Sequence, residues 1–382
     1  MKKLFIYISI AVLIVSCRSN EIEYPDYTYQ TVYFPVQYPV RNIQLGESRY
    51  DNSLDLDSSF TIGVNISGMY NNTKERIVYV RYAPELVANA DTTLLTDLGD
   101  TIKVLPANYY TPDLSTLDKI VIPAGSFDGR IKIKLNSKFY SDPKTIGVRY
   151  VIPLVIVPSN KDTIFTGIRP ISYILGKSTP TTLDSVLIGQ PVIGLKYPNR
   201  MIIANWQAGF MPMDYTLFGV KYTNKYHGNY FHYGVDSTYK ANVLTTKRYS
   251  TSTIEANTIT LLKTVSLTES TIDRLGGTNL ATALNKFKYM MKLKFNNDKS
   301  IELSTVPNPP TNDAVVIAGN GRYLEPKDGI SWGGKGRKTI ILKYKFTDTN
   351  GEHRCTDTIV YRTDAIVYQD FKVRQTVSLR KK

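Results

Sequence analysis

Residues 338–361 read KTIILKYKFTDTNGEHRCTDTIVY, and this stretch decides the fold class. Lysines alternate with apolar and aromatic residues up to Phe346, and a second β-type run returns from Thr356 to Tyr361. Asn350-Gly351 stands between the two runs and is a strong signal for a two-residue turn between antiparallel strands. The stretch therefore predicts a hairpin, and hairpins of this length indicate an antiparallel barrel or sandwich.

The residues before this hairpin show the same type of pattern. Lysines interleave with apolar residues over 286–295, residues 296–298 (Asn-Asn-Asp) predict a turn, and residues 300–303 resume the β pattern. Residues 271–275 are the one place where we expect a short helix. We predict that residues 200–382 form an antiparallel β-barrel domain.

Short strands also fill the first half of the chain. Residues 60–66 alternate with period two, and residues 77–82 are β-branched and aromatic. Residues 150–157 are continuously apolar, which indicates a strand buried on both faces, although Pro153 favours an edge or bulge position. Strands at this spacing, separated by Pro, Gly and Asn, predict an immunoglobulin-like β-sandwich over residues 31–168. The predicted fold class is all-β.

A linker is expected at residues 169–199, which contain four prolines. The charge also changes here. Residues 17–195 hold 17 Lys and Arg against 18 Asp and Glu, whereas residues 196–382 hold 28 against 15. The basic half indicates either a polyanion-binding surface or a solvated lysine face that keeps the domain soluble. We favour solvation over an acidic glycan, and an acidic glycan over nucleic acid, which we do not expect as a partner.

The N-terminus predicts export and lipid attachment. Residues 1–16 comprise a basic start, a short apolar run and a final serine, and Cys17 follows directly. These features describe a secretory signal, and the apolar run is too short to span a bilayer. Cys17 in this position resembles the lipidated cysteine of a bacterial lipobox. We therefore expect a signal peptide at residues 1–16 and a lipidated tether at residues 17–30.

Signatures of catalysis and metal binding are missing from the sequence. Cys355 is the only cysteine besides Cys17, which excludes an internal disulfide and a cysteine-based metal site once Cys17 carries lipid. His227 and His232 are five residues apart in a β-type segment, so they would project to opposite faces of a strand. The acidic pair in residues 55–57 stands in a polar loop, where we expect solvation. We predict no enzyme activity, no metal and no cofactor.

Aromatic residues supply the candidate binding site. The candidates are Tyr226, His227, Tyr230 and Tyr233 in one ring-rich segment, with Trp206 upstream and Trp332 in a glycine-rich loop. An exposed aromatic ring covers the apolar face of a sugar, and neighbouring polar side chains bond its hydroxyl groups. The alternative is that these rings pack the barrel interior, because alternation turns about half of them inward. Trp332 has the strongest claim to exposure.

Both halves of the chain resemble one known group of proteins. The first half resembles the immunoglobulin-like N-terminal domain of Bacteroidetes surface lipoproteins encoded in glycan-utilisation loci, through YPVRNIQLG (38–46), IGVNISG (62–68), LPANYY (105–110) and YVIPL (150–154). The second half resembles the lipocalin-like β domain that follows it, through DYTLFGVKYTNKYHGNY (214–230), SWGG (331–334), RK (337–338) and DT (357–358). The resemblance covers nearly all of the mature chain.

This resemblance implies a lipid-anchored outer-membrane protein that faces the cell exterior. It would bind an oligosaccharide or polysaccharide, acidic ones included, for import by a TonB-dependent transporter and its partner lipoprotein. Some relatives carry a glycosidase domain after the immunoglobulin-like one, and this sequence shows none, so we expect binding without cleavage. The alternative function is an adhesin or assembly protein that binds other surface proteins.

Overall fold

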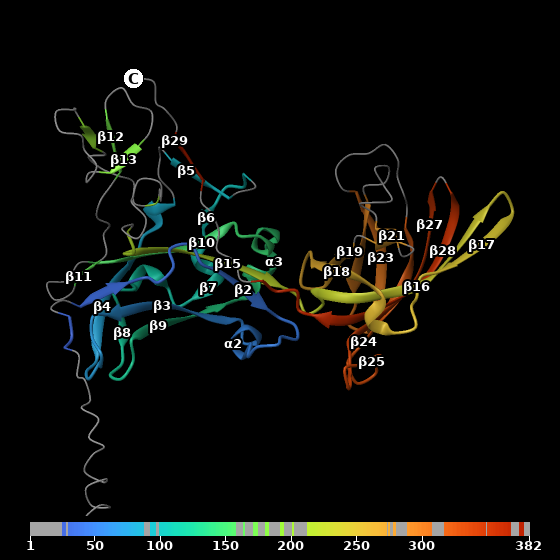
Figure 1. The fold of residues 1–382 in the computed structure, drawn as a ribbon, viewed down its shortest axis with the longest axis horizontal. Coiled ribbons are helices and arrows are strands. Elements are labelled where there is room, and N and C mark those ends of the chain that lie inside the picture. The colour runs from blue at the N-terminus through green and yellow to red at the C-terminus, as the bar shows by residue number, and fades with distance from the viewer. Residues whose placement is uncertain are drawn as a thin grey trace, which may run out of the picture.

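The structure, a computed structural model, describes residues 25–27, 30–87, 92–96, 99–157, 201, 212–272, 289–307, 317–348 and 350–367. It also describes short strands at residues 163–164, 171–174, 180–182, 192–194, 274–275, 278–279 and 374–377. Nearly all of the regular structure is β, which confirms the predicted all-β class (Figure 1). No helix in the described ranges is long and apolar enough to cross a membrane. The predicted signal peptide, Cys17 and Trp206 lie outside the described residues.

The first domain is a sandwich of two sheets. One sheet has the order β11-β1-β3-β9-β7, from Thr163–Ile164, Thr31–Tyr33, Ser59–Ser67, Asp128–Leu135 and Tyr110–Thr111. The other has the order β2-β15-β10-β4-β8, from Val40–Gln44, Tyr215–Thr223, Tyr150–Ile156, Arg76–Tyr82 and Lys119–Ile122, and β6 (Lys103–Val104) pairs with β10. Among the described residues, the α-helices are α2 (Ser53–Leu56) and α3 (Ser137–Ser141). Single 3-10 turns occur at Pro84–Leu86, Ala107–Tyr109, Leu114–Thr116 and Pro143–Ile146, and another lies in the second domain at Ile254–Ala256.

The sandwich core forms where apolar side chains of the two sheets meet. β3 buries Phe60, Ile62, Val64 and Ile66 and turns the residues between them outward, as period-two alternation requires. β10 confirms the prediction of a strand buried on both faces. Its even-numbered residues pack in the core between the sheets, while its odd-numbered valines pack in a second apolar cluster on the opposite face.

The expectation that Pro153 marks an edge or a bulge was wrong. β10 lies in the middle of its sheet, between β15 and β4. On the side of β4, the ladder partners of β10 stop at Val151, which pairs with β6, and resume at Leu154, which pairs with β4. Pro153 lies in this gap, where no ladder hydrogen bond needs its missing N–H.

β15 belongs to the first domain, which corrects the expected start of the barrel at residue 200. The strand pairs antiparallel with β10 and parallel with β2, so it fills the middle of the second sheet. Its apolar pattern suits either domain, and only pairing with strands distant in sequence decides between them. The barrel therefore begins at β16.

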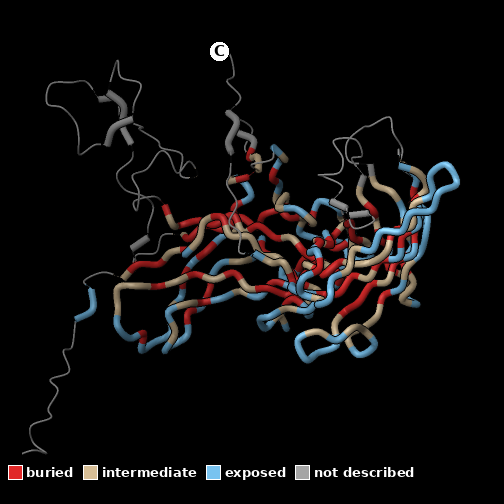
Figure 2. The backbone as a smooth tube through the Cα atoms, turned by 45° about the vertical axis from the view of Figure 1, so that its right-hand side comes forward, coloured by how far each residue is buried: buried red, intermediate tan, exposed pale blue. Residues whose placement is uncertain are grey.

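The second domain is a closed antiparallel barrel of eight strands, which confirms the predicted barrel. Its order is β16-β18-β19-β22-β23-β24-β27-β28, and β28 pairs back with β16. The strands are Gly228–Lys240, Thr258–Thr264, Glu269–Ile272, Tyr289–Phe295, Ser300–Pro307, Ala318–Leu324, Thr339–Asp348 and Gly351–Thr363. β17 (Val243–Arg248) pairs with the far half of β16, and this hairpin projects beyond the barrel with every β17 residue exposed (Figures 1 and 2).

β27 and β28 form the predicted hairpin. Asp348 pairs with Gly351, so the turn closes one residue earlier than Asn350-Gly351 predicts. Gly351 has a φ of +129°, a conformation that favours glycine. The prediction of a short helix at residues 271–275 was wrong, because β19 and β20 (Arg274–Leu275) occupy that segment. The last three residues of β19 are buried.

Four small sheets complete the described structure. They pair β13 (Pro180–Thr182), β12 (Ile171–Ile174) and β14 (Val192–Gly194), β20 with β21 (Thr278–Asn279), β25 (Ser331–Trp332) with β26 (Lys335–Gly336), and β29 (Arg374–Val377) with β5 (Thr92–Leu95). The first of these sheets lies within the segment predicted as a linker. The last one brings the C-terminal segment back to the sandwich domain.

Candidate functional site

Asn224 holds the chain where it leaves the sandwich and enters the barrel. Its side-chain nitrogen donates to two backbone oxygens of the β18–β19 turn, at 2.7 and 2.9 Å, and its side-chain oxygen accepts from the backbone N–H of Tyr226. A second contact joins the domains, because the Tyr361 hydroxyl donates to the backbone oxygen of Glu47 at 3.1 Å. These contacts orient β16, the strand that carries Tyr230 and Tyr233 and directly follows Tyr226 and His227.

Trp332 lies against the outer wall of the barrel, on the β25–β26 hairpin. Its ring meets Phe231 edge to face with the centroids 5.1 Å apart, and its indole N–H donates to Glu255 Oε1 at 2.6 Å. The Arg337 guanidinium lies 5.0 Å from the Trp332 ring centroid, and its Nε donates to the Trp332 backbone oxygen at 3.0 Å. These contacts hold the indole in one orientation, and the residue stays half-exposed.

Tyr233 and Tyr239 lie on the same outer face of β16 as Phe231, because alternate residues of a strand share a face. Tyr233 is half-exposed, and Tyr239 is exposed with the Arg354 guanidinium 4.6 Å from its ring centroid. Tyr239 was missed among the predicted site residues. Extending the alternation from Tyr233 along the same strand would have found it.

Tyr226 and Tyr230 pack the barrel core, which corrects their assignment as sugar-contacting residues. Tyr226 stacks on Phe295 with the ring centroids 3.6 Å apart. Tyr230 is fully buried, and its hydroxyl donates to the backbone oxygen of Tyr226 at 2.7 Å. Neither ring presents a face to solvent, so the packing alternative holds for both.

His227 lies at the domain junction, with its Nδ1 3.3 Å from Thr264 Oγ1. Burial, followed by the positive charge of Lys221, lowers the pKa of His227 to about 4. The imidazole is therefore neutral at physiological pH. It can exchange a hydrogen bond with a ligand but contributes no charge.

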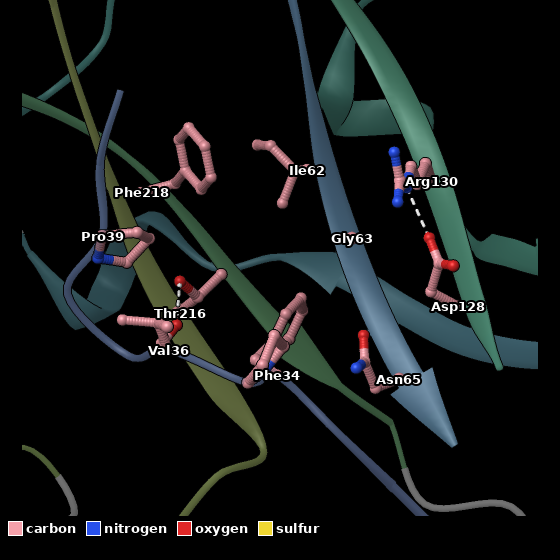
Figure 3. A pocket seen from close by; sticks show the side chains of 11 residues that line it. Phe34, Val36, Pro39, Ile62, Gly63, Asn65, Asp128, Arg130, Thr216 and Phe218 are labelled. Carbon is pink, nitrogen blue, oxygen red and sulfur yellow. Dashed lines mark hydrogen bonds and ion pairs between the residues drawn. The ribbon is translucent and has the colours of Figure 1, made fainter. Parts of the chain in front are cut away.

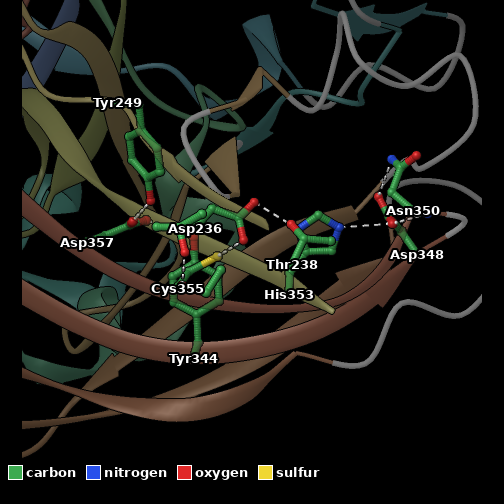
Figure 4. Close-up of polar contacts among 11 residues, drawn as sticks. Asp236, Thr238, Tyr249, Tyr344, Asp348, Asn350, His353, Cys355 and Asp357 are labelled. Carbon is green, nitrogen blue, oxygen red and sulfur yellow. Dashed lines mark hydrogen bonds and ion pairs between the residues drawn. The ribbon is translucent and has the colours of Figure 1, made fainter. Parts of the chain in front are cut away.

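A polar cluster occupies part of the barrel interior (Figure 4). Asp357 is fully buried, and its carboxylate accepts hydrogen bonds from Tyr249, from Tyr344 at 2.7 Å and from His232 Nε2 at 2.8 Å. A buried carboxylate is stable only when such donors surround it. Gly234 makes room for them, because a Cβ there would lie 2.7 Å from Asp357 Oδ1 and 2.9 Å from the Tyr249 hydroxyl.

His353 extends this cluster toward the β27–β28 turn. Its Nδ1 is 2.8 Å from Asp236 Oδ2 and its Nε2 is 3.0 Å from Asp348 Oδ1, so the protonated ring donates to a carboxylate from both nitrogens. Burial, the largest single effect, acts to lower the pKa of His353, but the two carboxylates together raise it. Burial and the charge of Asp236 raise the pKa of the Cys355 thiol, which therefore stays protonated and unreactive.

Two buried polar atoms beside this cluster, His232 Nδ1 and Thr260 Oγ1, have no hydrogen-bond partner. They lie on the neighbouring strands β16 and β18. With Nε2 of His232 donating to Asp357, Nδ1 accepts a hydrogen bond in the neutral ring and donates one in the protonated ring, and a hydroxyl group suits both. The described residues contain no group of three or more His, Cys, Asp or Glu side chains arranged to hold a metal ion.

The sandwich contains a pocket of about 350 Å³ (Figure 3). An apolar wall and a polar rim line it, formed by Phe34, Pro39 and Phe218 on one side and Asn65, Asp128 and Arg130 on the other. The pocket forms because β1 ends at Tyr33, so no described strand pairs with that edge of β3 before Asn65. Its volume is in the lower part of the range for small-molecule sites. None of the predicted site residues lines it.

Asp55 is buried, which corrects the expectation that it is solvated. It bonds to Arg41 and accepts from the backbone N–H of Gln44 at 3.1 Å. Burial is the largest effect on Asp55 and raises its pKa. Asp57 is exposed and bonds to two lysines of β9 at 3.1 and 2.8 Å. The two carboxylates serve separate structural contacts.

Family models match the two domains separately. A model described as a domain of unknown function (DUF5627) matches residues 225–365, and a model described only as an N-terminal domain matches residues 27–163. The first range agrees with a barrel that begins at β16, and the second covers the sandwich from β1 to the start of β11 and leaves out β15. No curated protein matches the chain.

The chain is similar to solved structures from Bacteroides. A Bacteroides ovatus protein of unknown function has 26% identity and a TM-score of 0.70, over 92% of this chain and 99% of its own. A multidomain Bacteroides ovatus protein including DUF1735 has 12% identity and a TM-score of 0.36, over 90% of this chain and 99% of its own. An auxiliary nutrient binding protein from Bacteroides thetaiotaomicron has 12% identity and a TM-score of 0.32, over 84% and 90%. Of these three, the first is close enough to share the two-domain fold.

Proposed function

We propose that this chain is a lipid-anchored surface protein that binds oligosaccharide on the outer wall of its barrel without cleaving it. The observation that carries the proposal is Trp332, which is held half-exposed with Glu255 at its indole N–H and the Arg337 guanidinium over its ring. The ring can cover the apolar face of a sugar, while charged side chains beside it bond the hydroxyl groups. Tyr233 adds a second half-exposed ring on the neighbouring surface of β16.

Three buried carboxylates, those of Asp357, Asp236 and Asp55, are already occupied by structural contacts, which supports binding without hydrolysis. Glycosidases place two carboxyl groups on either side of one glycosidic bond, free to act as acid and as nucleophile or base. Here Asp357 and Asp236 lie inside the barrel and are occupied by tyrosine and histidine donors. Asp55 is occupied by Arg41. Each of these groups already has a structural role.

The proposed location rests on the sequence of the N-terminus. The signal-like residues 1–16 and Cys17 support attachment to the outer membrane, with the protein facing outward beside a TonB-dependent transporter. The sandwich would then separate the barrel from the membrane. Replacing Cys17 by alanine should move the protein from the membrane fraction to the soluble fraction, and unchanged fractionation would contradict lipid attachment.

Retention of the full chain on immobilised plant and host glycans tests the binding function, followed by calorimetry with any glycan that retains it. Trp332→Ala should weaken binding by tenfold or more, because an aromatic anchor contributes roughly 2 kcal/mol when truncated. Tyr79→Ala is the matched control, since it removes an exposed aromatic ring from the sandwich, 46% exposed, and should leave affinity unchanged. If no glycan retains the protein, the proposed function is contradicted. If both variants bind equally well, the binding site does not include Trp332.

An assembly or adhesion role is the second candidate. Ile77, Tyr79 and Val121 are 40%, 46% and 38% exposed on the outer face of β4 and β8, where Ile77 and Val121 are direct cross-strand partners. Exposed apolar clusters of this kind mark protein contacts. Capture of a partner surface protein without glycan, abolished by Tyr79→Lys and unaffected by Trp332→Ala, would favour this role over glycan binding.

A further inference from the structure

One wall of the barrel concentrates positive charge. We define the basic wall as the outward-facing residues of β24, β27, β28, β16 and β17, which are neighbours in that order. Directly paired residues of neighbouring strands face the same side of a sheet, so the strand register defines this surface, and two side-chain contacts agree with it. The hydroxyls of Ser237 and Thr246 lie 3.4 Å apart, and the Arg354 guanidinium lies 4.6 Å from the Tyr239 ring centroid.

The basic wall carries six exposed cations, which are Arg248, Arg322, Lys343, Lys345, Arg354 and Arg362. Strand register places them in adjacent rows. Lys345 is the direct cross-strand partner of Arg354, and Arg248 lies in the same row as Lys343, three strands away. Neighbouring strands are about 4.8 Å apart, so this row spans about 15 Å. The cations therefore form one continuous surface rather than scattered charges.

Little negative charge balances this surface. Among the described outward residues of the five strands, the single carboxylate is Glu352, and it bonds to Arg354 at 2.7 Å. Among the described residues, none of the other five cations has a carboxylate within ion-pair distance. On the opposite wall, Lys292 and Lys294 each bond to a glutamate at 3.1 Å. A surface that serves solubility alone mixes both signs, as the opposite wall does, whereas a one-sign field attracts a polyanion.

Aromatic and hydroxyl side chains stand among these cations. Tyr233 and Tyr239 flank the cations along β16. Thr356 lies between Lys343 and Arg248 in one row, and Ser237 and Thr246 continue the row of Lys345 and Arg354. Sugar rings pack on tyrosine and exchange hydrogen bonds with hydroxyl groups, while carboxylate or sulfate substituents pair with Lys and Arg. We propose that the basic wall binds an acidic saccharide.

The inference rests on the proposed function and adds to it the class of glycan and a second group of contact residues. Trp332 and the basic wall share β16, because Phe231 under the indole and Tyr233 beside the cations face the same side of that strand. One glycan chain could therefore run from the indole along the outer face of the barrel to the cations of β27 and β28.

The test uses the full chain with Cys17→Ala, which removes the lipid and touches neither described domain. Affinity is measured for heparin (sulfated), polygalacturonate (a uronate), neutral dextran and xyloglucan, and vesicles of phosphatidylglycerol. We expect binding to at least one acidic polysaccharide. It should weaken at least tenfold between 0.1 and 1 M NaCl, because the Debye length falls from about 10 Å to about 3 Å.

Two double variants assign the site. Lys343→Gln with Lys345→Gln should lower affinity for the acidic polysaccharide about tenfold, as expected for two exposed charge contacts. Lys292→Gln with Lys294→Gln removes the same charge from the opposite wall and should bind like the wild type. Equal affinity of the two double variants would overturn the assignment to this wall.

The remaining outcomes separate the inference from the proposed function. Binding of neutral glycans alone, insensitive to salt, would overturn the inference and leave the proposed function intact. Binding of no glycan would overturn both. Binding to the anionic vesicles but to no acidic polysaccharide would overturn the inference in favour of a membrane surface.

Discussion

Replacing Asp357 by alanine should destabilise the barrel by about 3–5 kcal/mol. The carboxylate is fully buried and accepts three hydrogen bonds, from Tyr249, Tyr344 and His232. Each buried donor left without an acceptor costs about 1–3 kcal/mol, which gives an upper bound of about 9 kcal/mol. A water molecule in the space left by the carboxylate can satisfy some donors, and the desolvation cost of the charge is relieved, so the net effect is smaller.

Urea unfolding of the full chain, followed by a barrel-specific probe, measures this effect. With a slope of about 2 kcal/mol per molar, the barrel midpoint should fall by about 2 M. Tyr344→Phe is the matched control, because it removes one donor and leaves the carboxylate with two, and it should cost about 1–2 kcal/mol. If Asp357→Ala unfolds within 1 kcal/mol of the wild type, or no more easily than Tyr344→Phe, the reasoning about this cluster is refuted.

Three further predictions concern the barrel and its junction. The carboxylates of Asp236 and Asp348 raise the pKa of His353 above its unfolded value of about 6.5. The stabilisation of the folded state by protonated His353 is therefore complete below that pH and is lost as the pH rises through the folded pKa. The urea midpoints of the wild type and His353→Gln should therefore converge as the pH becomes alkaline. A difference between the midpoints that does not change with pH would contradict the ion pairs of His353 with Asp236 and Asp348. His227 has the opposite effect on the pH dependence of stability. Burial lowers the pKa of His227 to about 4, so the folded protein loses stability as the pH falls below about 6.5. An NMR titration midpoint of His227 near 6.5 would refute this burial. Gly234→Ala places a Cβ 2.3 Å from the Thr356 backbone oxygen and should cost about 1–3 kcal/mol in the same unfolding assay, whereas wild-type stability would mean that the close packing is absent.

Local patterns predicted the strands but not their neighbours. The alternation at residues 60–66 and 338–346 became β3 and β27, because one face of each strand is buried and the other is solvated. β15 has the same kind of pattern, yet its place in the sandwich depends on β10 and β2, far away in sequence. The prediction of an edge or bulge at Pro153 was wrong for a related reason. The central strand β10 tolerates this proline because of a gap between its partners β6 and β4, which local sequence does not reveal.

For the candidate site, too, the sequence predicted residue types but not how the strands orient them. Residue type pointed to the rings of residues 226–233, but the strand register decides which of them face outward, and Tyr226 and Tyr230 face the core. The polar cluster has no local signal at all, because His232 and Asp357 are 125 positions apart and meet only when β28 closes the barrel on β16. Cations of the basic wall were visible as an excess of charge in the second half. Their concentration on one wall depends on the pairing of five strands.

Alternation also places the polar cluster and the basic wall back to back on the same strands. On β28, the side chains of Cys355 and Asp357 point inward into the polar cluster, whereas that of Arg354 points outward and belongs to the basic wall. Under conditions where both proteins are fully folded, Asp357→Ala should therefore keep its affinity for acidic glycan while losing stability. Lys343→Gln with Lys345→Gln should show the reverse, lower affinity at unchanged stability. Measuring both quantities on both variants separates folding from recognition, and loss of affinity in folded Asp357→Ala would mean that the interior contacts position the wall as well as stabilise it.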